Sequence, residues 1–281
     1  MTIKELKSQF SKELSGLYPS EELQSFFSLL SEFILNYSRL DTVVNAAEAI
    51  SEENLSRFEN AIERLKGYEP IQYIIGKTEF YGLPLTLNPN TLIPRPETEE
   101  LVSWILEDQK QLWGGSILDI GTGSGCIAIA LAKNLSKASV EALDVSPEAL
   151  EVAAENTMNN KVSVEFYEMD ILTTDHLPKN YDVIVSNPPY VRELEKEMMH
   201  TNVLKHEPPT ALFVSNEEPL LFYRNIAMLA LKHLSSSGKL YFEINEYLRE
   251  ELTDLLQNLG FSTIVARKDI FGKDRMLRCN V

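Results

Sequence analysis

The first 70 residues carry apolar side chains at helical spacing. A first stripe consists of Ile3, Leu6, Phe10 and Leu14. A second stripe follows Pro19–Glu22, where Ser20 is the expected N-cap, and a third begins after Ser51 and ends at Gly67. Apolar residues that recur every three or four positions form the buried face of a helix. The pattern predicts a small all-helical N-terminal domain over residues 1–70.

Residues 71–97 change to an alternating pattern. Turn residues at 76–77, 81–82 and 88–90 separate three short apolar runs, which predicts a β-hairpin linker between two domains. Arg95 stands between two prolines, which hold its backbone extended. The next helix is expected to begin at Glu97 or Thr98.

From residue 98 to residue 281, apolar runs of strand length alternate with helical stripes. The expected strands are Ser116–Ile120, Val140–Asp144, Val162–Tyr167, Tyr181–Ser186, Lys239–Ile244, Ser262–Arg267 and Arg275–Asn280. The expected helices include Pro147–Thr157, Pro219–Leu234, Arg249–Leu259 and one that starts at Cys126. This order predicts an α/β, doubly wound, mostly parallel seven-stranded Rossmann-like sheet. Such sheets bind ligands at the carboxyl ends of their strands.

Composition narrows the class of protein. The chain has 281 residues, of which 44% are hydrophobic and 24% charged, as in soluble globular proteins. No apolar run reaches membrane-spanning length, and the N-terminus lacks the apolar core of a signal peptide. Two cysteines provide no disulfide framework. We therefore expect a cytoplasmic protein, and nothing in the sequence demands more than a monomer.

The net charge of the chain indicates which kinds of partner it can bind. The formal net charge is -16, and no basic patch or arm is visible. Because proteins that grip nucleic acid do so through clustered lysine and arginine, direct nucleic-acid binding is not expected.

The segment Asn187-Pro188-Pro189-Tyr190 directly follows a buried β-branched strand. Neither proline has an N–H, so no ladder or helix continues through them. The result is a stiff corner that offers a side-chain amide, free carbonyls and an aromatic ring. Such a corner suits the binding of a planar amine or amide by its hydrogens, although an ordinary Pro-Pro turn would read the same in isolation.

The loop between the first strand of the sheet and its helix is rich in glycine. It consists of Asp119, Ile120, Gly121, Thr122, Gly123, Ser124 and Gly125. Its G-x-G-x-G spacing differs from the G-x-G-x-x-G of pyrophosphate binders, and it lacks the lysine of a phosphate-binding loop. The spacing favours S-adenosylmethionine, a ligand without phosphate, over the dinucleotide of a dehydrogenase.

Acids at the next two strand ends support this ligand. Asp144 can accept hydrogen bonds from both ribose hydroxyls, and Asp170 with Ile171 can take the adenine amino group and ring. Asp119 can orient the loop or face the methionine amino group. Beside the methyl group, the Asn187 side-chain oxygen and the Pro188 carbonyl could accept the two hydrogens of an amide nitrogen, with Tyr190 flanking the planar group. Orientation in a water-poor pocket would then supply most of the catalysis.

Several further segments resemble one family. They are PIQYIIGKTEFYGL, LIPRPETEELV, DIGTGSG and SNPPY, followed by Glu207-Pro208, Phe222-Tyr223-Arg224, Phe242-Glu243-Ile244 and Lys268-Asp269. With these, the chain resembles the HemK-type (PrmC) protein-(glutamine-N5) methyltransferases of peptide chain release factors, which are class I S-adenosylmethionine-dependent enzymes. The IPRPETE segment is the most specific of these motifs.

The resemblance implies a substrate and a set of site residues. The substrate would be the glutamine in the Gly-Gly-Gln loop of class 1 release factors. Asn187 and Pro188 would bind its amide, and Gly121–Gly125, Asp144, Ile171 and Asn187 would border the cofactor. The N-terminal helices would help to dock the release factor.

The chain departs from the family pattern at two places. Residues 213–219 replace a Gly-Gly-x-Asp-Gly run, and Asn245-Glu246-Tyr247 replaces a Gly-Gln pair. Both departures lie outside the cofactor loop and the corner, so they affect the surrounding loops rather than the reaction class.

Other interpretations remain at this stage. A nucleic-acid adenine-N6 methyltransferase would use the same corner on a flipped base, and a binding protein with a degenerate site would not turn over at all. His206 and Glu207 could be catalytic or could simply pack a loop. Cys126 could be a reactive thiol or a small buried residue.

Overall fold

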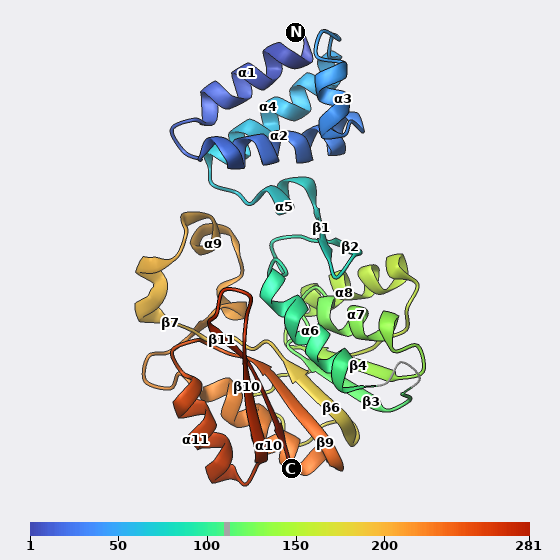
Figure 1. Ribbon diagram of the computed structural model, residues 1–281, viewed down its shortest axis with the longest axis vertical. Coiled ribbons are helices and arrows are strands. Elements are labelled where there is room, and N and C mark those ends of the chain that lie inside the picture. The colour runs from blue at the N-terminus through green and yellow to red at the C-terminus, as the bar shows by residue number, and fades with distance from the viewer. Residues whose placement is uncertain (110–112) are drawn as a thin grey trace. The chain divides into compact units, whose positions relative to one another are not determined.

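The computed structural model describes residues 1–109 and 113–281 (Figure 1). These residues form two compact units. One comprises Met1–Gly76 with His200–His206, and the other comprises Lys77–Met199 with Glu207–Val281.

The smaller unit is entirely helical apart from a short bridge. Its helices are α1 (Ile3–Leu14), α2 (Ser20–Leu35), α3 (Arg39–Val44), α4 (Glu52–Lys66), α5 (Ile71–Ile75) and α9 (Thr201–His206). The predicted apolar stripes form its core: Leu6, Phe10, Phe27 and Phe58 are almost completely buried. This confirms the helical interpretation of the N-terminal region.

Of the two N-cap residues predicted in this region, one is confirmed and the other is wrong. Ser51 is the N-cap of α4, and its hydroxyl accepts the Asn54 N–H at 3.2 Å. Ser20 is not the N-cap of α2; that position belongs to Pro19, and Ser20 is the first helical residue. Pro19 makes no side-chain cap, and its carbonyl accepts the Leu23 N–H at 3.1 Å, the first hydrogen bond of the helix.

The linker contains one hairpin and one unexpected helix. Strands β1 (Lys77–Phe80) and β2 (Leu83–Thr86) pair antiparallel, as predicted. The run before them, which the alternating pattern assigned to a strand, is helix α5 instead. It buries Ile71 and Ile74, which are three positions apart, and ends at Gly76 with φ +73°.

The larger unit contains the predicted seven-stranded sheet. Its strands are β3 (Ser116–Ile120), β4 (Ser139–Asp144), β5 (Glu165–Glu168), β6 (Tyr181–Ser186), β9 (Leu234–Glu243), β10 (Ser262–Lys268) and β11 (Asp274–Asn280). The order is β10-β11-β9-β6-β3-β4-β5. Only β11 runs against the others, because β10 pairs antiparallel with β11 and so has the same direction as β9 and the remaining strands. The chain goes outward from β3 through β4 to β5 and then returns to place β6 on the other side of β3. Ligands of such sheets bind at this reversal.

Helices cover both faces of the sheet (Figure 1). Helix α6 (Pro96–Asp108) precedes β3, and α7 (Cys126–Asn134) and α8 (Pro147–Asn160) follow β3 and β4. Helices α10 (Leu221–His233) and α11 (Arg249–Leu259) lie before and after β9 in the chain. Alternate strand residues face opposite sides. Ile117 and Val183 therefore join one core with α6 and α7, whereas Leu118 and Ile184 join a second core with α10 and α11.

Two strands begin more than one residue away from the predicted position, each for a local reason. Strand β5 begins at Glu165 rather than Val162, because Val162 takes part in the C-terminal cap of α8, where its N–H donates to the Thr157 carbonyl. Strand β9 begins at Leu234, five residues before the predicted start, and a register irregularity opposite Tyr181–Val183 accommodates the extra residues.

Short elements fill the connection from β6 to α10. They are β7 (Val191–Arg192), the 3-10 helix η1 (Glu193–Met198), the 3-10 helix η2 (Pro209–Ala211) and β8 (Phe213–Val214). Strands β7 and β8 pair parallel and fix the chain that leaves the Asn-Pro-Pro-Tyr corner. Among the helices that the structure describes, none has the length and apolar character needed to cross a membrane.

Candidate functional site

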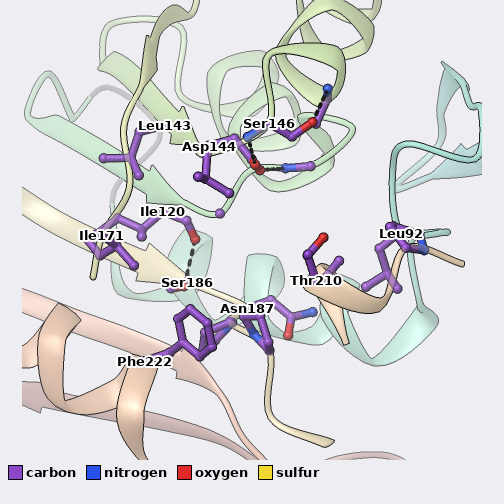
Figure 2. A pocket seen from close by; sticks show the side chains of 18 of the residues that line it. Leu92, Ile120, Leu143, Asp144, Ser146, Ile171, Ser186, Asn187, Thr210 and Phe222 are labelled. Carbon is purple, nitrogen blue, oxygen red and sulfur yellow. Dashed lines mark hydrogen bonds between the residues drawn. The ribbon is translucent and has the colours of Figure 1, made fainter. Parts of the chain in front are cut away.

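A cavity of about 260 Å³ lies at the carboxyl ends of β3, β4 and β6. This is close to the lower end of the roughly 300–1,000 Å³ typical of small-molecule sites. In Figure 2, Asp144 and Ser146 lie on the opposite side of the cavity from Asn187 and Phe222. The cavity therefore occupies the sheet edge at which the sequence predicted ligand binding.

The glycine loop forms one wall without side chains. Gly121 and Gly123 line the cavity with φ values of +73° and +54°, a conformation that suits glycine. A Cβ built on either residue would meet no atom within 4 Å, so open space adjoins the bare backbone. The loop is fixed from behind, because the N–H groups of Gly121 and Thr122 both donate to the Leu143 carbonyl.

Asp144 sits at the end of β4 beside this loop. Its Oδ2 accepts the Gly123 N–H at 2.8 Å, and its Oδ1 accepts the Ser146 N–H at 3.0 Å. A carboxylate oxygen has two lone-pair sites, so each oxygen retains one for a ligand hydroxyl. The carboxylate thus holds the loop and faces the cavity at once.

A further part of the cavity wall is apolar with one acid. Met169, Asp170 and Ile171 line it after β5, and Phe222 and Ile226 line it from α10. Asp170 Oδ1 accepts the Leu172 N–H at 2.9 Å, which fixes the carboxylate in a local turn. This combination can enclose a flat ring while it accepts from an exocyclic amino group.

The Asn-Pro-Pro-Tyr corner borders the cavity on the β6 side. Asn187, Pro188 and Pro189 line it, and Asn187 Nδ2 donates to Thr98 Oγ1 at 3.3 Å. Within the described residues, neither Asn187 Oδ1 nor the Pro188 carbonyl accepts a hydrogen bond. Two acceptors are therefore left unpaired on adjacent residues at the cavity edge.

A smaller hollow of about 40 Å³ adjoins the corner. Asn187 and Pro188 line both spaces, and Tyr190, Arg95 and Glu243 contribute only to the smaller one. The corner thus lies between a large and a small compartment.

Behind the corner stands a buried acid. Glu243, at the end of β9, accepts from Thr98 Oγ1 at 2.6 Å and from the Tyr190 hydroxyl at 3.0 Å. Burial raises the pKa of Glu243, while the two hydroxyl donors and Arg275 act in the opposite direction.

Four of the predicted site residues do not line the large cavity. Tyr190 borders the smaller hollow, whereas Thr122, Ser124 and Gly125 belong to the glycine loop but line neither space. Thr122 donates to Asp119 Oδ2 at 2.7 Å. At Gly125 a Cβ would approach Ile129 and Ala153 to about 3.0 Å, so glycine allows close packing of the loop on α7 and α8.

Asp119 is fully buried under the loop. Burial raises its pKa to about 7, and the hydroxyl of Thr122 and the N–H of Ala128 counteract this by donating to Oδ2. Its Oδ1 accepts no hydrogen bond from any described residue. Through Thr122 and Ala128 it connects the loop to the start of α7.

The sequence left two possible roles for each of three side chains, and all three lie outside the cavity. Glu207 is buried and accepts from Arg95 at 2.6 Å and from the Ile93 N–H at 3.2 Å, which ties two loops together. His206 contacts the Gly67 carbonyl within the helical unit. Burial raises the pKa of the Cys126 thiol to about 12, which argues against a reactive thiolate.

Sequence reasoning missed a part of the cavity wall. Pro89–Leu92 from the linker, Pro208, Thr210 and Ala211 from the β6–α10 connection, and Phe222 and Ile226 all contribute. The family motifs contain Leu92, Pro208 and Phe222, but no local pattern marked any of these residues as part of the site.

Two protein-family models match the chain. One, described as the PrmC N-terminal domain, matches residues 5–76, and the other, described as the methyltransferase small domain, matches residues 98–213.

Relatives align over almost the entire length. A release factor glutamine methyltransferase of Flavobacterium psychrophilum is 48% identical over 283 residues, covering 100% of this chain and 99% of that protein. Another of Bacteroides thetaiotaomicron is 44% identical and covers 96% of each chain. Among solved structures, a methyltransferase from Pyrococcus furiosus superposes with a TM-score of 0.52 at 21% identity, covering 79% of this chain and 98% of that one. That likeness supports the fold alone.

Proposed function

The chain belongs to the family of release factor glutamine methyltransferases, and we propose that its cavity binds S-adenosylmethionine while its Asn-Pro-Pro-Tyr corner presents a release factor glutamine for methylation. The acceptor is the side-chain nitrogen of the glutamine in the Gly-Gly-Gln loop of class 1 release factors. The observation that carries the proposal is the pair of unpaired acceptors, Asn187 Oδ1 and the Pro188 carbonyl, at the edge of the strand-end cavity.

The cavity residues fit the proposed cofactor. Asp144 would hold the ribose hydroxyls with the lone pairs that Gly123 and Ser146 leave free. The bare backbone of Gly121 and Gly123 would face the amino-acid part, and Asp170 with Ile171 would hold the adenine. Thr122, Ser124 and Gly125, in the same loop, would hold these two glycines in place. When bound, S-adenosylmethionine supplies a methyl group on a positively charged sulfur, which leaves as a neutral thioether.

The corner residues would act on the glutamine amide. An amide nitrogen is a weak nucleophile because its lone pair is delocalised into the carbonyl. Acceptance of its two N–H groups by Asn187 Oδ1 and the Pro188 carbonyl would increase the electron density on nitrogen and aim it at the cavity. Pro189 would stiffen the corner and Tyr190 would flank the amide plane. Preorganised acceptors of this kind stabilise charge that develops in the transition state.

The two units would divide the work. We propose that the helical region docks the release factor, that the hairpin joins the parts, and that the sheet domain carries the chemistry, with residues 1–70, 71–97 and 98–281 as the three regions. A monomer would suffice for this scheme, since every residue proposed for the site comes from one chain. Because release factors act on ribosomes, the activity belongs in the cytoplasm, and no direct contact with nucleic acid or membrane is required.

Substitution of the corner amide tests the mechanism. Asn187→Ala removes the acceptor that is used in the transition state, and preorganised donors or acceptors of this kind contribute about 10²- to 10³-fold to kcat. We expect a loss of at least that size in methyl transfer to a release factor, with an unchanged melting temperature and cofactor dissociation constant. Near-normal methylation by the folded variant would rule out this role for Asn187.

A further inference from the structure

Glu243 is a buried acid to which the reaction above gives no task. Its side chain ends β9 and is 1% exposed. A buried carboxylate is costly unless it is well hydrogen-bonded. Both of its oxygens accept from hydroxyls, one from Thr98 on α6 and one from Tyr190 in the corner.

Thr98 stands between this acid and Asn187. Its Oγ1 lies 2.6 Å from Glu243 Oε2 and 3.3 Å from Asn187 Nδ2. A hydroxyl has one hydrogen and two lone pairs, and a carboxylate can only accept. The hydrogen of Thr98 is therefore committed to Glu243, so Thr98 can only accept from Asn187.

The direction of these hydrogen bonds selects one of the two orientations of the Asn187 amide. With Nδ2 facing the Thr98 lone pair, Oδ1 is left as the unpaired acceptor at the cavity edge. The opposite orientation would put two acceptors together at Thr98. It would also present N–H donors to the N–H groups of a substrate amide.

We propose that Thr98 and Glu243 are positioning residues that hold the Asn187 amide in its acceptor-outward orientation, an inference that rests on the proposed function of the corner. The acid sets the polarity of the hydroxyl, and the hydroxyl sets the orientation of the amide. Thr98 lines neither space, and both oxygens of Glu243 are already occupied by the two hydroxyls. Each acts through Asn187, which would otherwise sample both orientations, one of them unproductive.

The same carboxylate also anchors the far end of the corner. The Tyr190 hydroxyl donates to Glu243 Oε1, and the backbone carbonyl of Tyr190 accepts from Asn245 Nδ2 at 3.0 Å. Asn187 and Tyr190 are thus connected to one buried group from both ends of the Pro-Pro step. The corner and the amide orientation are fixed together.

A graded series at Thr98 tests the proposal. Thr98→Ser keeps the hydroxyl, Thr98→Cys keeps a weaker hydrogen-bonding group of similar size, and Thr98→Val keeps the shape without any hydrogen bond. The kcat for transfer of labelled methyl to a release factor should decrease in the order Ser, Cys, Val. We expect kcat of the Val variant to fall by about 10- to 100-fold. This is the range found when a residue that orients a metal-binding side chain is replaced. Both KM values should stay within about twofold, because an interaction realised in the transition state affects kcat.

A matched control separates positioning from general stability. Thr157 is also buried, on α8, and its hydroxyl donates to the Ala153 carbonyl at 2.8 Å. Thr157→Val makes the same chemical change away from the corner and should leave kcat unaltered. If Thr98→Val fails to fold, the Ser and Cys pair still carries the comparison.

The outcomes are distinct. Wild-type kcat in Thr98→Val or Thr98→Cys, an effect on KM alone, or equal losses in the Ser and Val variants would overturn the positioning role. Absence of transfer to the release factor by the wild-type enzyme would instead overturn the proposed function itself.

Discussion

Asp144 performs two tasks with a single carboxylate. It accepts two backbone N–H groups, from Gly123 and Ser146, and it borders the cavity where a ribose would lie. The same side chain would therefore shape the loop and recognise the ligand.

Removal of this carboxylate should affect cofactor binding first. A hydrogen bond to a charged group contributes about 1.5–3 kcal/mol, so Asp144→Ala should weaken S-adenosylmethionine binding by roughly 10- to 150-fold. Calorimetric titration of the cofactor measures this. Glu151→Ala, which removes an exposed acid from the following helix, is the control for net charge and should bind normally. An unchanged dissociation constant for Asp144→Ala would mean that the ribose lies elsewhere.

Individual residues also mark the limit of sequence reasoning. Asp144, Asn187 and the glycines were identified because each follows a recognisable strand within its own short motif. The contact between Thr98 and Glu243 joins residues 145 positions apart. Each of the two residues lies in a family motif, but neither motif indicates that the two meet, so only the folded sheet reveals their contact behind Asn187.

At the scale of elements, local patterns predicted the long segments well and the short ones poorly. The sheet strands and their helices contain enough periodic residues to define their type. Helix α5 has five residues, too few for a period of two to be distinguished from a period of 3.6. The elements from β7 to β8 depend on pairing and on loop contacts that no local pattern contains.

One departure from the family pattern has a structural role at this scale. Asn245 follows β9, is 5% exposed, and donates through Nδ2 to the Tyr190 carbonyl and to Glu195 Oε2, each at 3.0 Å. Its Oδ1 accepts the Tyr247 N–H at 3.0 Å. Asn245 therefore connects the end of β9 to the corner and to η1.

This connection should contribute to stability. Asn245→Ala leaves the buried Glu195 and the Tyr190 carbonyl short of a donor, and such losses cost about 1–3 kcal/mol. We expect the free energy of unfolding in urea to fall by that amount. Cofactor affinity should be retained, because Asn245 does not line the large cavity. Asn180→Ala, an exposed asparagine, should change stability by less than about 0.5 kcal/mol. If Asn245→Ala were as stable as this control, the proposed contribution of Asn245 to stability would be contradicted.

At the scale of the whole molecule, the grouping of the chain is not simply sequential. Residues 200–206 follow the corner in sequence, yet they belong to the helical unit. His206 lies 3.0 Å from the Gly67 carbonyl, and the Lys205 ammonium lies over the Tyr68 ring. No composition change marks this return, so the sequence suggested divisions only near residues 70 and 97.

Net charge bears on the class of substrate. A charge of -16 disfavours binding to a nucleic-acid backbone, which suits a protein side-chain amide better than a flipped base in a duplex. The relatives named for release factor glutamine methylation agree with this choice.

The most direct test of the account is methyl transfer from labelled S-adenosylmethionine to a purified class 1 release factor. The intact factor is assayed beside a variant in which the loop glutamine is replaced. Label on the intact factor alone is the predicted result, and it would identify the substrate, the residue and the reaction together. Label on neither factor, but on adenine-containing DNA or RNA, would contradict the account.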